Sequence, residues 1–219
     1  MNFPRIFKTN SVNTARSPIQ MVSVSLLLAL SLSACETAGY SPLVDYEQLS
    51  PASIFATPEP LPSPNYSTEQ LSRGRYMVGM LGCGSCHTEG ALNGTPDAAK
   101  LLAGSSTGIA YTSPFIDDNP GVVYPPNLTP DMETGLGTWT MNQLVEMVRV
   151  GTRDLSARSL PVMPWPAFSG ITNEDAFSIA AYLKSLAPVR NLVPANVEPG
   201  QRTNGEYIHF GIYQSRNPQ

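Results

Sequence analysis

Three segments of the chain combine a helix-capping residue with apolar side chains at helical spacing. They run from Ser67 towards Leu81, from Thr140 to Gly151 and from Thr172 to Pro188. In the first two, the capping residue has a glutamine three positions later (Gln70 and Gln143), which is the spacing of a capping box. The pattern predicts three helices.

The sequence between these helices is rich in residues that interrupt regular structure. The chain of 219 residues holds 21 Pro and 17 Gly, yet 42% of its residues are hydrophobic. We expect an all-α helical bundle with long irregular loops, the longest over 88–138 with one helical turn at 98–102. In the C-terminal segment 189–219, residues 207–213 could form a short strand or pack on the domain.

Gly74 lies inside the first predicted helix, where glycine is unfavourable unless another backbone passes close by. The third predicted helix offers two small residues for such a contact, Ala180 and Ala181. We therefore predict that the first and third helices cross at Gly74.

The N-terminus has the pattern of an export signal. Three basic residues precede an apolar run over 21–32, which is too short to span a membrane comfortably. The run ends in Leu-Ser-Ala-Cys at 32–35, which resembles a bacterial lipobox. We expect a lipoprotein signal peptide over 1–34, a lipid on Cys35 and a Pro-rich tether over 35–66. The alternative is an ordinary signal peptide that leaves Cys35 as a free thiol.

Without residues 1–34 the chain would have 10 basic residues (13 less the three in that segment) and 17 acidic ones, a net charge of −7. This charge disfavours nucleic acid as a partner. It also disfavours adsorption to anionic lipid, so the lipid on Cys35 would have to supply the membrane anchor.

The only Cys-x-x-Cys-His sequence of the chain, Cys83 to His87, is the attachment sequence of a c-type haem. Cys83, Cys86 and His87 are spaced to lie on one face of a helical turn. Two thiols would bind the haem covalently and the imidazole would bind its iron. The three cysteines of the chain are then all assigned, two to haem and Cys35 to lipid.

Two other interpretations of this motif are a zinc site and a redox-active dithiol. A structural zinc site needs four ligands, which the neighbouring sequence does not supply. A thioredoxin-like dithiol would lie in a βαβ pattern, which the sequence lacks.

The second iron ligand is sought among the methionines and His209, the other histidine of the chain. Met163 is the preferred candidate because the prolines around it predict a rigid, non-helical segment. Met132, in a loop, and His209, in the C-terminal segment, are the alternatives. The remaining candidates lie at helical positions: Met77, Met80, Met141 and Met147.

This ligand decides between two classes of function. A sulfur ligand opposite histidine favours Fe(II) and fills the sixth iron position, as in an electron carrier. An open sixth position would indicate a gas sensor or a peroxidase-like enzyme.

The chain from about 67 to 188 resembles bacterial class I c-type cytochromes, and most closely the cytochrome c modules of membrane-bound alcohol and sugar dehydrogenases. The segments that carry the resemblance, in addition to Cys83–His87, are Arg73–Tyr76, Asn127–Asp131, Thr134–Trp139, Met163–Trp165 and Ala181–Leu183. Subunits of this kind usually hold three such modules, whereas this chain has one motif.

The resemblance implies a helical bundle with crossed terminal helices and one covalent haem c with His87 and Met163 as axial ligands. It implies an electron-transfer protein, not a catalyst, with a donor and an acceptor among dehydrogenases, quinol-oxidising complexes or terminal oxidases. Together with the lipobox, it predicts an exported protein, lipid-anchored on the periplasmic side of a bacterial membrane. Trp139 and Trp165 could lie on the haem or pack in the core.

Overall fold

The computed structural model describes residues 57–151 and 162–210. The predicted signal peptide, Cys35, most of the tether and the segment 211–213 therefore lie outside the described residues. Among those described, no helix is long and apolar enough to cross a membrane.

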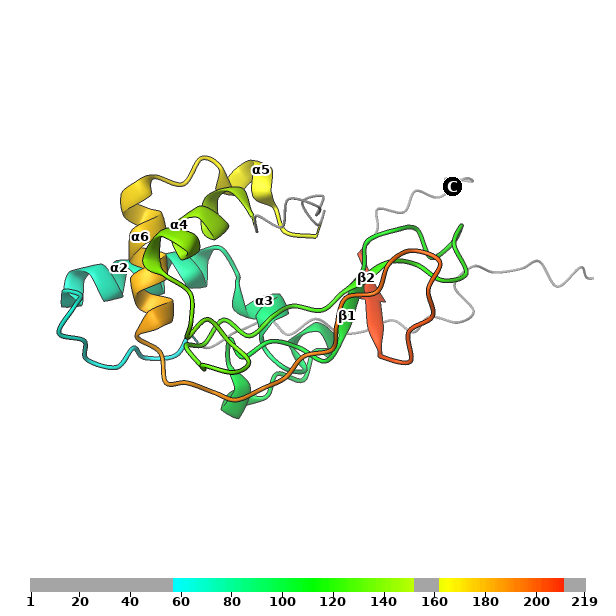
Figure 1. The fold of residues 1–219 in the computed structure, drawn as a ribbon, viewed down its shortest axis with the longest axis horizontal. Helices are drawn as coiled ribbons and strands as arrows, with labels where there is room; N and C mark the ends of the chain where they lie inside the picture. Colours follow the sequence, from blue (N-terminus) through cyan, green and yellow to red (C-terminus); the bar gives the residue numbers. More distant parts are fainter. Residues whose placement is uncertain (1–56, 152–161, 211–219) are drawn as a thin grey trace, which may run out of the picture. The chain divides into compact units, whose positions relative to one another are not determined.

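Three main helices form where the capping pattern predicts them (Figure 1): α2 (Thr68–Met80), α4 (Met141–Val150) and α6 (Asn173–Lys184). The N-cap side chains Ser67, Thr140 and Thr172 each accept a hydrogen bond from a backbone N–H in the first turn. At α4 both halves of the predicted capping box are present.

Helices α2 and α6 cross at Gly74, as predicted. A methyl group on Gly74 would overlap the carbonyl oxygen of Ser178 and lie 2.6 Å from Cβ of Tyr182. The predicted partners Ala180 and Ala181 are not the nearest residues. Ser178 and Tyr182, one turn apart, face α2 with backbone and Cβ atoms, so their larger side chains do not prevent the close approach.

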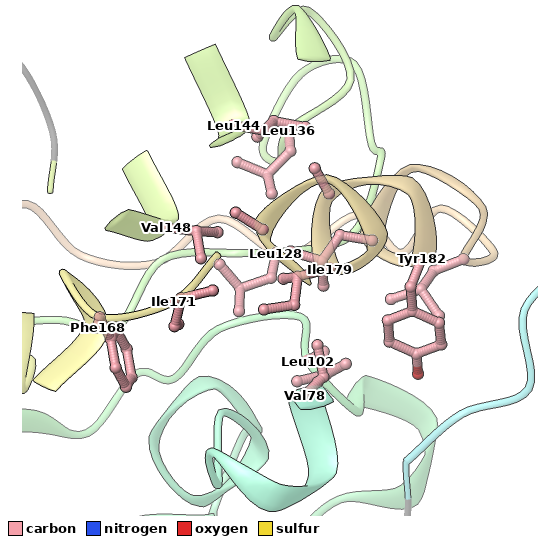
Figure 2. Close-up of a cluster of buried hydrophobic side chains, with 14 residues drawn as sticks. Val78, Leu102, Leu128, Leu136, Leu144, Val148, Phe168, Ile171, Ile179 and Tyr182 are labelled. Atoms are coloured by element: carbon pink, nitrogen blue, oxygen red, sulfur yellow. The ribbon is translucent and has the colours of Figure 1, made fainter. Parts of the chain in front are cut away.

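The main apolar core lies between these helices and the loops that cross them (Figure 2). Leu144 and Val148 of α4 pack with Ile179 of α6, while Val78 of α2 joins Leu102 from the loop region. The side chains of Leu144 and Val78 are almost fully buried. This core holds α2, α4 and α6 together around the C-terminal end of α2, where the Cys-x-x-Cys-His motif begins.

A three-stranded sheet is an addition to the predicted helical bundle. Strand β1 (Gly108–Ala110) pairs antiparallel with β2 (Val122–Val123) and parallel with β3 (Tyr207–His209), in the order β2-β1-β3. The strand alternative for the C-terminal segment is thus the one observed, at 207–209. The predicted loop 88–138 contains β1, β2 and two 3-10 turns, η1 (Ala91–Asn93) and η2 (Ala98–Lys100).

One other short segment also differs from expectation. The Pro-flanked segment around Met163 was expected to contain no helix, but α5 (Trp165–Phe168) begins directly after Pro164. Proline is tolerated in a first helical turn because the N–H groups there have no intrahelical partner. Met163 itself precedes this helix.

The last part of the predicted tether, residues 57–64, binds to the surface of the domain. Tyr182 Oη donates to the Pro58 carbonyl at 2.7 Å, and the Leu61 N–H donates to the Ser185 carbonyl at 2.7 Å. Arg75 binds the Thr57 carbonyl and pairs with Glu59. We call residues 57–64 the strap, since they lie across α2 and α6.

Candidate haem site

The motif residues lie on one helical turn that follows α2 almost without interruption. Gly82 separates the two with φ = 68°, a left-handed conformation that glycine adopts without strain. Cys83 then caps α3 (Gly84–His87), and the His87 N–H donates to the Cys83 carbonyl at 3.0 Å. The two thiols and the imidazole are thereby brought to one turn, as their spacing predicts.

His87 is held in one orientation by a backbone carbonyl from a distant loop. The ring is buried, and Nδ1 lies 2.8 Å from the carbonyl oxygen of Pro126. A carbonyl oxygen can only accept, so Nδ1 carries the proton and Nε2 keeps its lone pair. Burial lowers the pKa of His87, against the opposing effect of this hydrogen bond. A neutral imidazole with a free Nε2 is the form that binds iron.

The two motif cysteines are free thiols in apolar surroundings. Burial raises the pKa of the Cys83 thiol to about 11 and also raises the pKa of Cys86. Reactive dithiols of the thioredoxin type depend on a lowered pKa, so these two cysteines have the opposite electrostatics.

Met163 packs against the same main core as Cys83. Cys83 and Met163 both pack against the main core, while Cys86 and the adjacent Val162 pack against a second cluster that includes Ile109. The Cys-x-x-Cys turn and the Val-Met pair therefore each bridge the two clusters. Two thiols, an imidazole with a free Nε2 and a thioether that packs on the same core as Cys83 form a donor set that fits haem c.

The two main alternative ligands, Met132 and His209, have other surroundings, whereas the helical Met77, Met141 and Met147 also pack against the main core. Met132 is 65% exposed. His209 lies in β3, and its ring makes an edge-on contact with Phe115, with centroids 5.6 Å apart. Met80 is exposed, and the sulfur of Met141 accepts a hydrogen bond from Tyr66 Oη. The structure thus brings Met163, but not Met132, into the core that borders Cys83.

The structure describes the side chain of only one of the two tryptophans, Trp139. Trp139 is partly buried against the main core, alongside Cys83 and Met163. The side chain of Trp165 is outside the described residues.

Sequence reasoning did not identify Pro126 or Lys184 as residues that shape the site. Lys184 Nζ donates to the carbonyls of Leu136, Gly137 and Trp139 at 2.8–3.2 Å, and so holds the turn that carries Trp139. The Pro-Pro-Asn sequence at 125–127 marked this segment as distinctive. The sequence alone does not show that the carbonyl of Pro126 accepts a hydrogen bond from His87.

Cytochrome relatives match more than half of this chain. The fructose dehydrogenase cytochrome subunit of Gluconobacter japonicus is 34% identical over 125 residues, which is 57% of this chain and 23% of that subunit. A nicotinate dehydrogenase subunit of Pseudomonas putida is 33% identical over 132 residues, or 60% of this chain and 10% of that protein. The matched region is similar to the cytochrome c modules of dehydrogenase subunits.

This similarity confirms the predicted resemblance, and the relatives imply haem c. A diheme cytochrome c-type protein of Cereibacter sphaeroides is 30% identical over 121 residues, or 55% of this chain and 38% of that protein. The chain thus spans between about a tenth and two fifths of the length of these relatives. No protein-family model matches the chain.

Proposed function

We propose that residues 67–188 form a monohaem c-type cytochrome domain that carries single electrons. Cys83 and Cys86 would hold the haem through thioether bonds, and His87 and Met163 would bind its iron. The observation that carries the proposal is the shared packing of Cys83 and Met163 against one apolar core, beside a His87 whose Nε2 is free. When bound, haem c supplies an Fe(III)/Fe(II) couple that takes up and releases one electron.

The residues of the chain suit this role in three ways. The Pro126 carbonyl fixes the tautomer of His87 and increases the electron density on its ring. The apolar clusters around Cys83 and Cys86 exclude water and lower the local polarity, which favours the less charged ferrous state. A thioether ligand from Met163 raises the reduction potential and leaves no position for oxygen or peroxide.

We propose that the protein is exported and anchored by a lipid on Cys35, with the domain on the periplasmic side of the membrane. The redox partner that the similarity supports best is a dehydrogenase, because several relatives are dehydrogenase cytochrome subunits. A quinol-oxidising complex or a terminal oxidase would be the other member of the electron path.

The ligand assignment is tested by comparing Met163→Ala with Met132→Ala in the purified haem protein. Reduced wild type and Met132→Ala should not bind CO rapidly, since their sixth iron position is filled. Met163→Ala should bind CO and have a lower reduction potential. Rapid CO binding by the wild type would indicate the sensor or peroxidase-like alternative, and an unchanged potential in Met163→Ala would place the ligand elsewhere.

The anchor is tested by Cys35→Ser in cells that express the whole chain. The variant should move from the membrane fraction to the soluble periplasmic fraction with its haem retained. Membrane retention equal to that of the wild type would contradict the lipid anchor and indicate a protein partner instead.

A further inference from the structure

The loop that holds His87 is itself held through one buried side chain, that of Asn127. Pro126 C=O, the acceptor for His87 Nδ1, and the N–H of Asn127 belong to one planar peptide group. The direction of the carbonyl therefore follows the position of Asn127. This asparagine is 1% exposed, although its amide is polar.

The Asn127 amide uses its full hydrogen-bonding capacity. Nδ2 donates to the Val189 carbonyl at 2.7 Å and to Thr134 Oγ1 at 3.0 Å. Oδ1 accepts from the N–H of Thr129 at 2.9 Å and from its hydroxyl at 2.8 Å. Two donors and two acceptor sites are all that an amide offers, so only one orientation of this side chain satisfies every bond.

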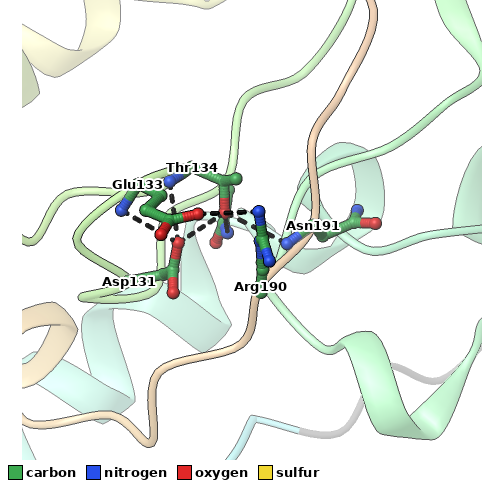
Figure 3. A network of polar contacts seen from close by, with 6 residues as sticks. Asp131, Glu133, Thr134, Arg190 and Asn191 are labelled. Carbon is green, nitrogen blue, oxygen red and sulfur yellow. Dashed lines mark hydrogen bonds and ion pairs between the residues drawn. The ribbon is translucent and has the colours of Figure 1, made fainter.

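Val189 belongs to the segment that follows α6, far from His87 in sequence. Its N–H donates to Thr129 Oγ1 at 3.1 Å, so both of its backbone groups bind the loop. Two residues later, the Asn191 N–H donates to Thr134 Oγ1 at 3.1 Å. Figure 3 shows this contact region, with Arg190 turned towards Glu133 and Asn191 beside Thr134.

A second connection leads from the same segment to the backbone of the motif. Asn191 Nδ2 donates to the Ala103 carbonyl at 3.0 Å, and the N–H of the next residue, Gly104, donates to the carbonyl of His87 at 2.9 Å. The C-terminal segment therefore reaches the ring of His87 through Asn127 and the Pro126–Asn127 peptide group, and its backbone through the Ala103–Gly104 peptide group.

We propose that Asn127 is a positioning residue for His87, and that Val189 and Asn191 in the C-terminal segment fix it in place. The inference rests on the proposed role of His87 as an iron ligand. The Nδ1–H···O bond to Pro126 makes the imidazole a stronger electron donor and so favours Fe(III). Disturbing Asn127 weakens that bond, which exposes Nδ1–H to exchange and raises the reduction potential.

The test uses Asn127→Asp in the full haem-containing protein. Aspartate has the same shape but cannot donate to Val189 and Thr134. We expect the His87 Nδ1–H, followed by NMR in the reduced protein, to exchange with solvent at least tenfold faster. Thr129→Val removes the hydroxyl between Asn127 and Val189 without adding a charge. It should show the same faster exchange together with a rise in reduction potential, and it serves if the aspartate variant does not fold.

The matched control is Arg190→Gln. It breaks an exposed ion pair between the same two segments, with side chains 76% and 66% exposed, but it leaves Asn127 untouched. Neither the exchange rate of His87 Nδ1–H nor the reduction potential should change in Arg190→Gln. The inference is overturned if folded, haem-containing Asn127→Asp and Thr129→Val exchange at the wild-type rate, or if Thr129→Val shows no rise in reduction potential. Absence of haem on Cys83 and Cys86 in the wild type would instead overturn the proposed function.

Discussion

The α carbon of Gly74 lies directly against the carbonyl oxygen of Ser178, with no room for a side chain between α2 and α6. Gly74→Ala should destabilise the protein by about 1–3 kcal/mol, since the added methyl group meets backbone atoms that cannot move aside. The free energy of unfolding in urea measures this effect.

Gly79→Ala is the control for that substitution. Gly79 lies on the exposed side of the same helix, where the nearest atom to an added methyl group would be Thr57 Oγ1 at 3.2 Å. The free energy of unfolding of Gly79→Ala should stay unchanged or rise by up to about 1 kcal/mol, because alanine favours the helix more than glycine does. Equal losses at both positions would show that the crossing is not the cause.

Acid should weaken the contact between α2 and the first turn of α6. A hydrogen bond from Arg73 lowers the pKa of Asp175 below its ordinary value of 3.8. The stability this pair contributes is therefore complete above about pH 4 and is lost as the pH falls through the lowered folded-state pKa. Arg73→Gln should bring the pKa of Asp175 back up, so that the free energy of unfolding falls less steeply as the pH is lowered below about 4.

Urea unfolding of wild type and Arg73→Gln at several pH values below 5 measures this difference. Arg190→Gln removes another exposed arginine–carboxylate pair and should leave the Asp175 contribution in place. If the free energy of unfolding depended on pH in the same way in wild type and Arg73→Gln, the loss of stability in acid could not be assigned to Asp175.

Lys184→Met should loosen the turn that carries Trp139. The substitution keeps an apolar stem but leaves three carbonyls without their shared cationic donor. We expect a loss of roughly 1.5–3 kcal/mol in unfolding free energy, the range for hydrogen bonds to a charged group. Lys100→Met, with the same change of charge in η2, should cost much less; a similar cost would indicate a general charge effect.

Tyr182→Phe should release the strap from α6. The lost hydroxyl leaves the Pro58 carbonyl without its donor, at a cost of about 1 kcal/mol. Limited proteolysis should then cut within residues 57–64 more rapidly than in the wild type. Tyr76→Phe, which removes an exposed hydroxyl, is the control and should leave the cleavage rate unchanged.

The sequence predicted those parts of the fold that depend on local signals. Ser67, Thr140 and Thr172 were correctly placed as helix caps, because a cap bonds only to its own first turn. The crossing at Gly74 was also predicted, since a glycine inside a helix indicates close contact. The choice of Ala180 and Ala181 as its partners was wrong: both are buried, but small side chains do not reveal which side of α6 faces α2.

Contacts between segments far apart in the sequence could not be predicted. Strand β3 pairs with β1 across nearly a hundred residues, and neither strand is long enough to show an alternating pattern. The Pro126 carbonyl that orients His87 is a backbone group, so no side-chain motif reports it. At the candidate site, the motif turn followed from spacing, whereas the packing of Met163 and Cys83 against one core required the structure.

The Asn127–Val189 contact also bears on the order in which this protein matures. It joins residues 62 positions apart, and closing so long a loop is entropically costly and slow. We expect the loop around His87 to become fixed late, after the C-terminal segment has been synthesised and has folded back onto it. Until then Cys83 and Cys86 would remain accessible for haem attachment. The separation of Asn127 and Val189 along the chain would thus postpone closure of the loop around His87.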